Sequence, residues 1–215
     1  VRYEPKGFRQ RRPNPDCPPD PENPLDPNDP DDMKHWIWDL KGVRLVPYRL
    51  PELLKSSMQD SVFIVEGEKD ADRLWDMGIP ATTNPMGAGK WRDDFNVYFK
   101  RRIVRIIPDN DKKKHRPGQK HAKQVATSLY GVAAEIRIVT LPKQKNGKEN
   151  KDISNFFDAG AEVKELLKLE DSAELFVPTN VSKSEKSNAD KPKQVDLLMG
   201  LCSDIELFHD NYRNG

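Results

Sequence analysis

The feature of this sequence that most constrains its fold is a set of short apolar runs that each lead into acidic residues. The runs and the acids that follow them are Val62–Val65 with Glu66, Ile103–Ile107 with Asp109 and Asp111, and, after a polar loop, Ile136–Val139 with Asp152. Runs of this length and composition are typical of strands buried on both faces. Parallel strands end at one edge of their sheet, so these carboxylates would gather there. Carboxylate oxygens are hard ligands that suit Mg²⁺ and phosphate chemistry.

Helical stretches separate the apolar runs. We expect strands over residues 62–65, 79–83, 103–107 and 134–140, and helices over residues 69–77, 91–101, 118–130 and 153–168. Strands that alternate with helices predict an α/β fold, a Rossmann-like parallel sheet flanked by helices. Ligands of such sheets bind at the carboxyl ends of the strands, which is where the acidic residues fall.

The first 58 residues are expected to form a separate β-rich subdomain. Strand-like stretches at 1–3, 7–10 and 35–40 flank residues 13–32, which hold eight prolines and seven acids. Such a segment cannot bury enough apolar surface to offset its ordering entropy, so we expect a disordered or extended insertion in an N-terminal β-ribbon. Trp36 and Trp38 fall on one face of the last stretch, where core packing is favoured over base stacking.

The remaining boundaries follow from composition. We expect an α/β domain that carries the acidic motifs over residues 59–170, a polar linker over 171–194, and the start of a truncated following domain over 195–215. Because the chain begins without Met and ends abruptly, we interpret it as an internal piece of a longer protein.

Overall charge predicts no partner, since 36 Lys and Arg nearly cancel 35 Asp and Glu. Local charge is more informative, because residues 100–123 hold ten Lys or Arg and two acids. A basic surface beside carboxylates suits a polyanion that approaches a metal; a solvated helix face is the alternative. The only cysteines, Cys17 and Cys202, imply neither a disulfide framework nor a zinc ribbon, so we expect a reducing, cytoplasmic (intracellular) location. No apolar run approaches the roughly 20 residues that span a bilayer, so no membrane partner is expected.

Each acidic motif has two interpretations. Glu66 is either a metal ligand or general acid/base, or an acid that stabilises a helix N-terminus. Asp109 and Asp111 could share one cation, because like charges so close are costly without one, or they could lie in a solvated turn. Asp152 could be a further ligand or the N-cap of the helix that follows it, and the two roles are compatible.

Basic side chains near these acids are candidates for binding phosphates of a nucleotide or nucleic acid. They are Lys90, Lys112, Lys113, Lys114, Arg116 and Lys120. Lys90 lies in the glycine-rich loop 86–90, which lacks the Walker pattern, and an ordinary strand-to-helix connection is the alternative. His121, on the first turn of its helix, is expected to pack or to cap.

The motifs taken in order resemble the toprim domain, and more narrowly that of phage- and plasmid-type primases and primase–helicases. They are Val-Glu-Gly-Glu-Lys-Asp-Ala at 65–71, Pro-Asp-Asn-Asp at 108–111 with Gly-Gln-Lys-His-Ala at 118–122, and Lys-Asp-Ile-Ser-Asn at 151–155. The resemblance implies that Glu66, Asp109 and Asp111 are catalytic ligands of Mg²⁺ or Mn²⁺, with Asp152 as a further metal ligand. It makes Asp70 a secondary acid on the first helix.

Two departures from the family pattern stand beside the motifs. Residues 112–116 resemble an insertion before the glycine of the second motif, and Asn155 stands where relatives often carry a second acid. The family resemblance implies a DNA primase, which joins nucleoside triphosphates on a single-stranded DNA template, with a covalently linked helicase or ATPase domain in the full-length protein. The alternatives are a toprim nuclease that hydrolyses nucleic acid, and a non-catalytic DNA-binding module of a primase–helicase.

Overall fold

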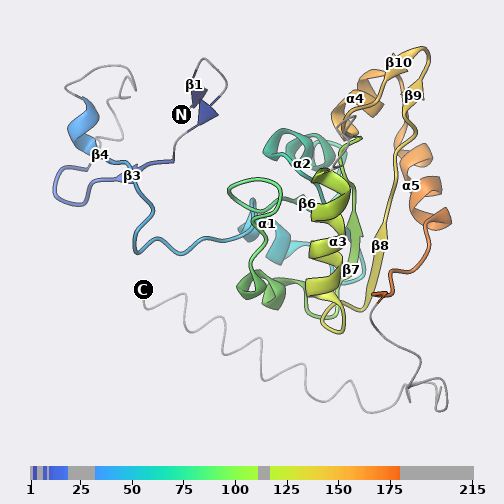
Figure 1. Cartoon of the computed structure of the whole chain (residues 1–215), viewed down its shortest axis with the longest axis horizontal. Coiled ribbons are helices and arrows are strands. Elements are labelled where there is room, and N and C mark those ends of the chain that lie inside the picture. The colour runs from blue at the N-terminus through green and yellow to red at the C-terminus, as the bar shows by residue number, and fades with distance from the viewer. Residues whose placement is uncertain (1, 4–6, 9, 19–31, 111–116, 180–215) are drawn as a thin grey trace. The chain divides into compact units, whose positions relative to one another are not determined.

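The computed structural model describes residues 2–3, 7–8, 10–18, 32–110 and 117–179. Its centre is a parallel sheet (Figure 1). The strand order in this sheet is β6-β5-β7-β8. The strands are β5 (Ser61–Ile64), β6 (Ala81–Thr82), β7 (Ile103–Ile106) and β8 (Glu135–Ile138). All three strand pairings are parallel, and helices connect the strands. The predicted α/β class is therefore confirmed.

Helices cover both faces of this sheet (Figure 1). On one face lie α1 (Leu50–Lys55), the 3₁₀ helix η2 (Asp93–Phe99) and α3 (Pro117–Leu129). On the other face lie α2 (Glu68–Trp75), α4 (Ile153–Asp158) and α5 (Val163–Ser172). Among the described residues, no helix is long and apolar enough to cross a membrane.

Alternation along the strands divides the core into two clusters. Val62 and Ile64 point to the face of α3, whereas Phe63 and Val65 point to the face of α2. All four are buried, because both faces of the sheet are covered. This double burial explains why the strands appear in the sequence as continuous apolar runs instead of alternating ones.

Two predicted helices differ in the structure. Residues 91–101 were expected to form a helix, and the segment that forms is the short 3₁₀ helix η2. The helix predicted over 153–168 is two helices, α4 and α5. The break follows from Gly160, whose φ of 85° lies in the left-handed region that ends a helix. Glu162 then begins α5 with a capping box that it shares with Glu165.

The N-terminal part contains the expected ribbon. Strand β1 (Arg2–Tyr3) pairs with β2 (Gly7–Phe8), and β3 (Arg12–Pro13) pairs with β4 (Trp36–Ile37), both antiparallel. A 3₁₀ helix, η1 (Asp32–His35), leads into β4, while β9 (Gln144–Lys145) and β10 (Lys148–Glu149) form a hairpin after β8. The β3–β4 pair joins the two sides of the acidic insertion. Most of that insertion, 19–31, lies outside the described residues, as does 195–215.

The two tryptophans of the ribbon form a stack with an arginine. The Arg11 guanidinium carbon lies 3.8 Å from the ring centroid of Trp36 and 5.6 Å from that of Trp38. Both indoles are partly buried. These are cation–π contacts. Among the described residues, neither tryptophan belongs to the two core clusters of the α/β domain, so core packing of these two rings stays a prediction.

A buried ion-pair network fixes α5 to the sheet. Arg105, in the central strand β7, contacts Glu170 of α5 and Glu135 of β8, each at 2.7 Å. Ser61 of β5 donates a hydrogen bond to the same Glu170 carboxylate. Arg137 contacts Glu135 and donates to carbonyl groups at the end of α5. Charged residues inside the strand runs are thus paired across the sheet.

We expect Arg105→Met to lower the free energy of unfolding by about 3–5 kcal/mol, because it leaves Glu170 buried without its arginine. Urea unfolding followed by circular dichroism measures this. The exposed pair Arg92–Asp94 supplies the control, since Arg92→Met should cost at most about 1 kcal/mol. The double variant Arg105→Met/Glu170→Met should recover much of the loss. An Arg105→Met protein as stable as the parent would contradict the network's role.

Candidate functional site

The strand register brings Glu66 to Asp109. Ile64 of β5 pairs with Ile106 of β7, so Glu66 is level with the residue just before Asp109. The Glu66 carboxylate turns toward β7, and its Oε1 accepts a hydrogen bond of 3.1 Å from the Asp109 backbone N–H. The first two predicted acidic motifs therefore meet at the carboxyl edge of the sheet, as the sequence pattern implies.

Gly118, at the start of α3, makes this approach possible. A Cβ atom at Gly118 would overlap Glu66 Oε1, and it would lie 3.1 Å and 3.2 Å from the Asp109 backbone O and N. Gly118 has an ordinary helical conformation, so its role here is close approach and not a special φ. The next residue, Gln119, donates from its side chain to the Asp109 carbonyl at 2.9 Å. Helix α3 thus packs directly on the Glu66–Asp109 contact.

Asn110 ties the second motif to the third. Its backbone N–H donates to the Lys151 carbonyl at 2.7 Å. Its side-chain amide donates to the carbonyls of Asn150 (2.9 Å) and Leu141 (3.3 Å). The segment that carries Asp152 is therefore held against the end of β7. The residue between the two predicted metal-binding aspartates has a structural role.

Asp152 is the N-cap of α4. Its carboxylate accepts a 2.7 Å hydrogen bond from the backbone N–H of Asn155. The capping interpretation of this residue is therefore confirmed, and its role as a metal ligand stays a prediction.

Asp70 is buried in the first turn of α2. It accepts hydrogen bonds from the backbone N–H (3.2 Å) and the hydroxyl (2.5 Å) of Ser154 in α4. Burial raises the pKa of Asp70 above its ordinary value, and the nearby Asp152 charge adds to this, while the Ser154 hydrogen bonds oppose it. In this structure Asp70 joins α2 to α4.

The remaining predicted residues divide into two groups. Asp111 and the basic residues Lys112, Lys113, Lys114 and Arg116 lie outside the described residues. Lys90 and Lys120 are exposed, Lys90 in the loop after β6 and Lys120 in the first turn of α3.

The oxygen donors at this edge suit a hard divalent cation. Within the described ranges, no three His, Cys, Asp or Glu side chains lie close enough together to hold a metal ion. The Glu66 carboxylate contacts the backbone N–H of Asp109, and both residues carry carboxylate groups. The amide Oε1 of Gln119 is a buried acceptor that has no hydrogen-bond partner in the described part of the chain. This donor set consists of oxygens only, which fits Mg²⁺ or Mn²⁺ better than a soft metal.

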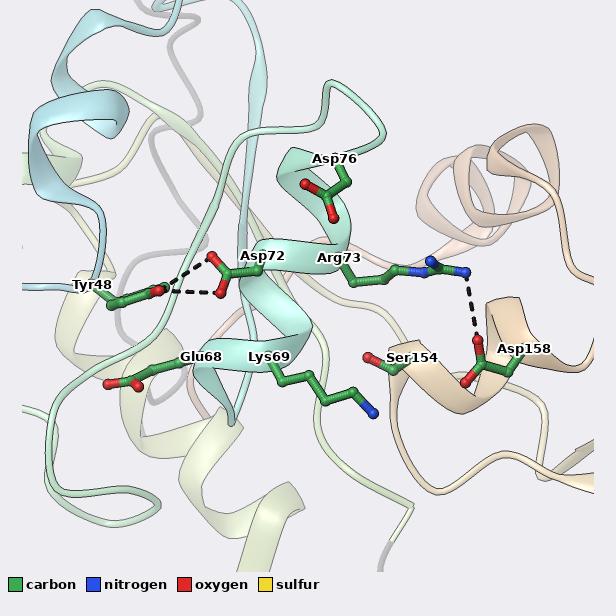
Figure 2. A pocket seen from close by; sticks show the side chains of 8 residues that line it. All are labelled: Tyr48, Glu68, Lys69, Asp72, Arg73, Asp76, Ser154 and Asp158. Atoms are coloured by element: carbon green, nitrogen blue, oxygen red, sulfur yellow. Dashed lines mark hydrogen bonds and ion pairs between the residues drawn. The ribbon is translucent and has the colours of Figure 1, made fainter. Parts of the chain in front are cut away.

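A separate pocket of about 440 Å³ lies along α2 (Figure 2). Its lining residues are Tyr48, Glu68, Lys69, Asp72, Arg73, Asp76, Ser154 and Asp158. Tyr48 donates to the Asp72 carboxylate at 3.1 Å and 3.2 Å. Arg73 reaches Asp158 at 3.5 Å. Neither Glu66 nor Asp109 lines this pocket, so it is distinct from the strand-edge site.

Three contacts at the site were not predicted from the sequence. Gly118, Gln119 and Ser154 all lie in the motifs quoted above, but no contact of these three residues was predicted. A small residue that follows an acidic pair and opens a helix is the signal that could have identified Gly118. The other two depend on the packing of α2 against α4 and of α3 against β7, which no local pattern specifies.

Comparison with known proteins gives structural neighbours only. No protein-family model matches the chain, and no curated protein matches it. It is similar to a structure of the DnaG catalytic core, with 18% identity and a TM-score of 0.47, covering 66% of this chain and 45% of that one. The DnaG primase catalytic domain bound to ssDNA (19% identity) and the E. coli primase catalytic core (17%) have the same TM-score of 0.47 and the same 66% coverage of this chain. The matches cover 45% and 44% of those two chains, so this chain spans less than half of each neighbour.

We expect Gly118→Ala to destabilise the protein by about 1–3 kcal/mol, because the added methyl group must displace Glu66 or the start of α3. The sign of the change in unfolding free energy tests the close approach, because Gly→Ala inside a helix ordinarily stabilises by up to about 1 kcal/mol. Thr127→Ala, at an exposed position of α3, is the control and should be neutral or slightly stabilising. Urea unfolding measures both. A stabilised Gly118→Ala variant would contradict the close approach.

We expect Asp70→Asn to be more stable than the parent at about pH 7 and to lose this advantage at about pH 3. The folded-state pKa of Asp70 is raised above the ordinary 3.8. Ionisation therefore costs stability as pH rises above the unfolded value, and the cost vanishes when the carboxyl is protonated in both states. The asparagine oxygen still accepts from Ser154. Unfolding free energies measured at the two pH values test this, and a pH-independent difference would refute it.

Proposed function

We propose that this chain carries a toprim-type DNA primase domain that joins nucleoside triphosphates into primers on single-stranded DNA. The observation that carries the proposal is the contact of Glu66 with Asp109 under Gly118, at the carboxyl edge of two adjacent central strands. These three residues come from the first two toprim-like motifs, in the order that the family resemblance requires.

The proposed ligands of the catalytic metal are Glu66, Asp109 and Asp111, with Asp152 as a further ligand. When bound, Mg²⁺ or Mn²⁺ would neutralise the triphosphate and lower the pKa of the attacking 3′-hydroxyl. The chain's own contribution is positioning. The Asp109 N–H orients Glu66, Gln119 holds the Asp109 carbonyl, and Asn110 holds the third motif against β7.

Basic residues supply the second part of the proposal. Lys90 and Lys120 are exposed on the loop and helix that adjoin the site. Together with Lys112, Lys113, Lys114 and Arg116, they would bind the phosphates of the incoming nucleotide and of the template. We further propose that the source is a phage- or plasmid-type replication protein in which a helicase or ATPase domain is covalently linked.

We expect Asp109→Asn and Asp111→Asn each to reduce primer synthesis at least about a hundredfold, because each removes a negative oxygen ligand from the metal. Incorporation of labelled nucleotide on single-stranded DNA with Mg²⁺ measures this. A double variant that makes primers at the parent rate would refute the proposal.

Asp152→Asn and Asp152→Ala separate the two roles of Asp152. Asparagine is also a good N-cap, so Asp152→Asn should keep the stability of the parent, while Asp152→Ala should lose about 0.5–2 kcal/mol. If Asp152 also binds the metal, both variants lose primer synthesis alike. If it is a cap only, activity follows stability and Asp152→Asn remains active. Urea unfolding and nucleotide incorporation on the same preparations distinguish these cases.

The two alternative functions give different results in the same assay. A toprim nuclease would degrade single-stranded DNA with Mg²⁺ when nucleotides are omitted. A non-catalytic module would bind DNA with a steep salt dependence and without any need for Mg²⁺. Primer synthesis that needs both nucleotides and Mg²⁺ excludes both.

A further inference from the structure

The glycine-rich loop after β6 has an unusual backbone that must be held in place. Met86, Gly87 and Gly89 have φ values of 73°, 80° and 80°. Met86 is not a glycine, so its left-handed conformation carries a steric cost of about 1 kcal/mol or more. A short loop with several such residues keeps one shape only where its surroundings hold it.

Asn84 holds the loop from its N-terminal side. This buried side chain donates to the carbonyls of Pro85 (3.0 Å) and Gly87 (2.8 Å). Its Oδ1 lies 2.9 Å from Nε2 of His121 in α3. The amide nitrogen of Asn84 therefore fixes the shape of the loop, and its amide oxygen joins the loop to α3.

His121 holds the loop from the other side. Its Nδ1 accepts a 3.0 Å hydrogen bond from the Gly89 backbone N–H. Because Nδ1 accepts, Nε2 must carry the proton that is donated to Asn84, so the contacts define a neutral ring in one tautomer. Burial lowers the pKa of His121, which favours the same neutral form.

The contacts of Asn84 and His121 with the loop lie beside the Glu66–Asp109 contact at the edge of the sheet. His121 lies three residues after Gly118 in α3, an advance of about 4.5 Å along the helix axis. Gly118 packs against Glu66. In the sheet, Thr82 pairs with Ile64, so Asn84 is level with Glu66. The loop therefore begins at the edge where Glu66 meets Asp109.

Lys90 is fixed between two anchored neighbours. Gly89 is bound by His121, and the Lys90 backbone N–H donates to the Gly87 carbonyl at 3.3 Å. Trp91 is buried; its ring packs on Phe95, and its Nε1 donates to Asn96 at 3.0 Å. The backbone at Lys90 is thus held on both sides while its side chain remains exposed.

We propose that His121 is a positioning residue that, through Gly89 and Asn84, holds this loop in the shape in which Lys90 binds the phosphates of a nucleoside triphosphate at the Glu66–Asp109 edge. The inference rests on the proposed function. It assigns to a buried histidine, expected only to pack or cap, a role in ligand binding that acts through another residue. Packing alone would require neither its tautomer nor its two polar contacts.

The test uses the whole 215-residue chain and Mg·ATP, with affinity measured by isothermal titration calorimetry. Lys90→Ala should weaken binding roughly tenfold to a hundredfold, the usual effect of losing a charged hydrogen bond. His121→Leu, which removes both polar contacts, should weaken binding comparably. The double variant should bind no more weakly than either single variant, because both changes remove the same contact.

A conservative variant separates positioning from bulk packing. In His121→Asn the side-chain oxygen can take the place of Nδ1 and accept from Gly89, so part of the affinity should return. Urea unfolding of every variant shows whether it folds. If His121→Leu is unfolded, the cycle of His121→Asn with Lys90→Ala takes its place, and the loss caused by His121→Asn should disappear in the Lys90→Ala background.

The outcomes distinguish this inference from the proposed function. Additive losses from His121 and Lys90, or parent-like affinity of a folded His121→Leu variant, would overturn the positioning role. If Asp109→Asn still abolishes primer synthesis in that case, the proposed primase function is retained and only the positioning role of His121 is rejected. If the parent chain fails to bind Mg·ATP, both fail.

Discussion

The hydrogen bond from the Asp109 backbone to Glu66 is the contact on which the site depends. It joins the ends of the two central strands, where the chain leaves β5 and β7. A carboxylate placed there needs donors or a cation to offset its lost hydration. The backbone N–H supplies one donor, and Gly118 lets α3 close over the pair without a side chain. Any side chain at position 118 would overlap the Glu66 carboxylate, so either the carboxylate or the start of α3 would have to move.

The first five residues of α3 contact the segments that follow three of the strands. Gly118 contacts Glu66 after β5, Gln119 holds Asp109 after β7, and His121 holds the loop after β6. A single rigid element therefore sets the relative positions of the acids and the glycine-rich loop. On the opposite face of the sheet, the buried ion pair Arg105–Glu170 fixes α5. Hydrogen bonds and close packing thus attach α3 to one face, and an ion pair attaches α5 to the other.

Much of this arrangement follows from the sequence because its causes are local. Apolar runs predicted three of the four parallel strands, β5, β7 and β8, whereas β6 was predicted from the shorter stretch 79–83. Asp152 before Ile153 was predicted as a helix cap or a metal ligand, and it is a cap. Glu66 and Asp109 were predicted to lie at one edge of the sheet because each follows a strand of the same parallel sheet. The division of residues 153–168 into two helices was not predicted, because a single glycine inside a helical pattern does not by itself mark a helix end. The Asp70–Ser154 and Asn84–His121 contacts were also missed, because each joins residues far apart in the chain whose meeting depends on helix packing.

The central claim is that Glu66 and Asp109 share a divalent cation, and a crystal structure grown with Mn²⁺ tests it most directly. Anomalous scattering should place manganese at the carboxyl edge of β5 and β7, with oxygens of Glu66 and Asp109 at about 2.0–2.2 Å. The same peak should vanish from crystals of Glu66→Gln. Manganese bound elsewhere, with no anomalous density at this edge, would contradict the account.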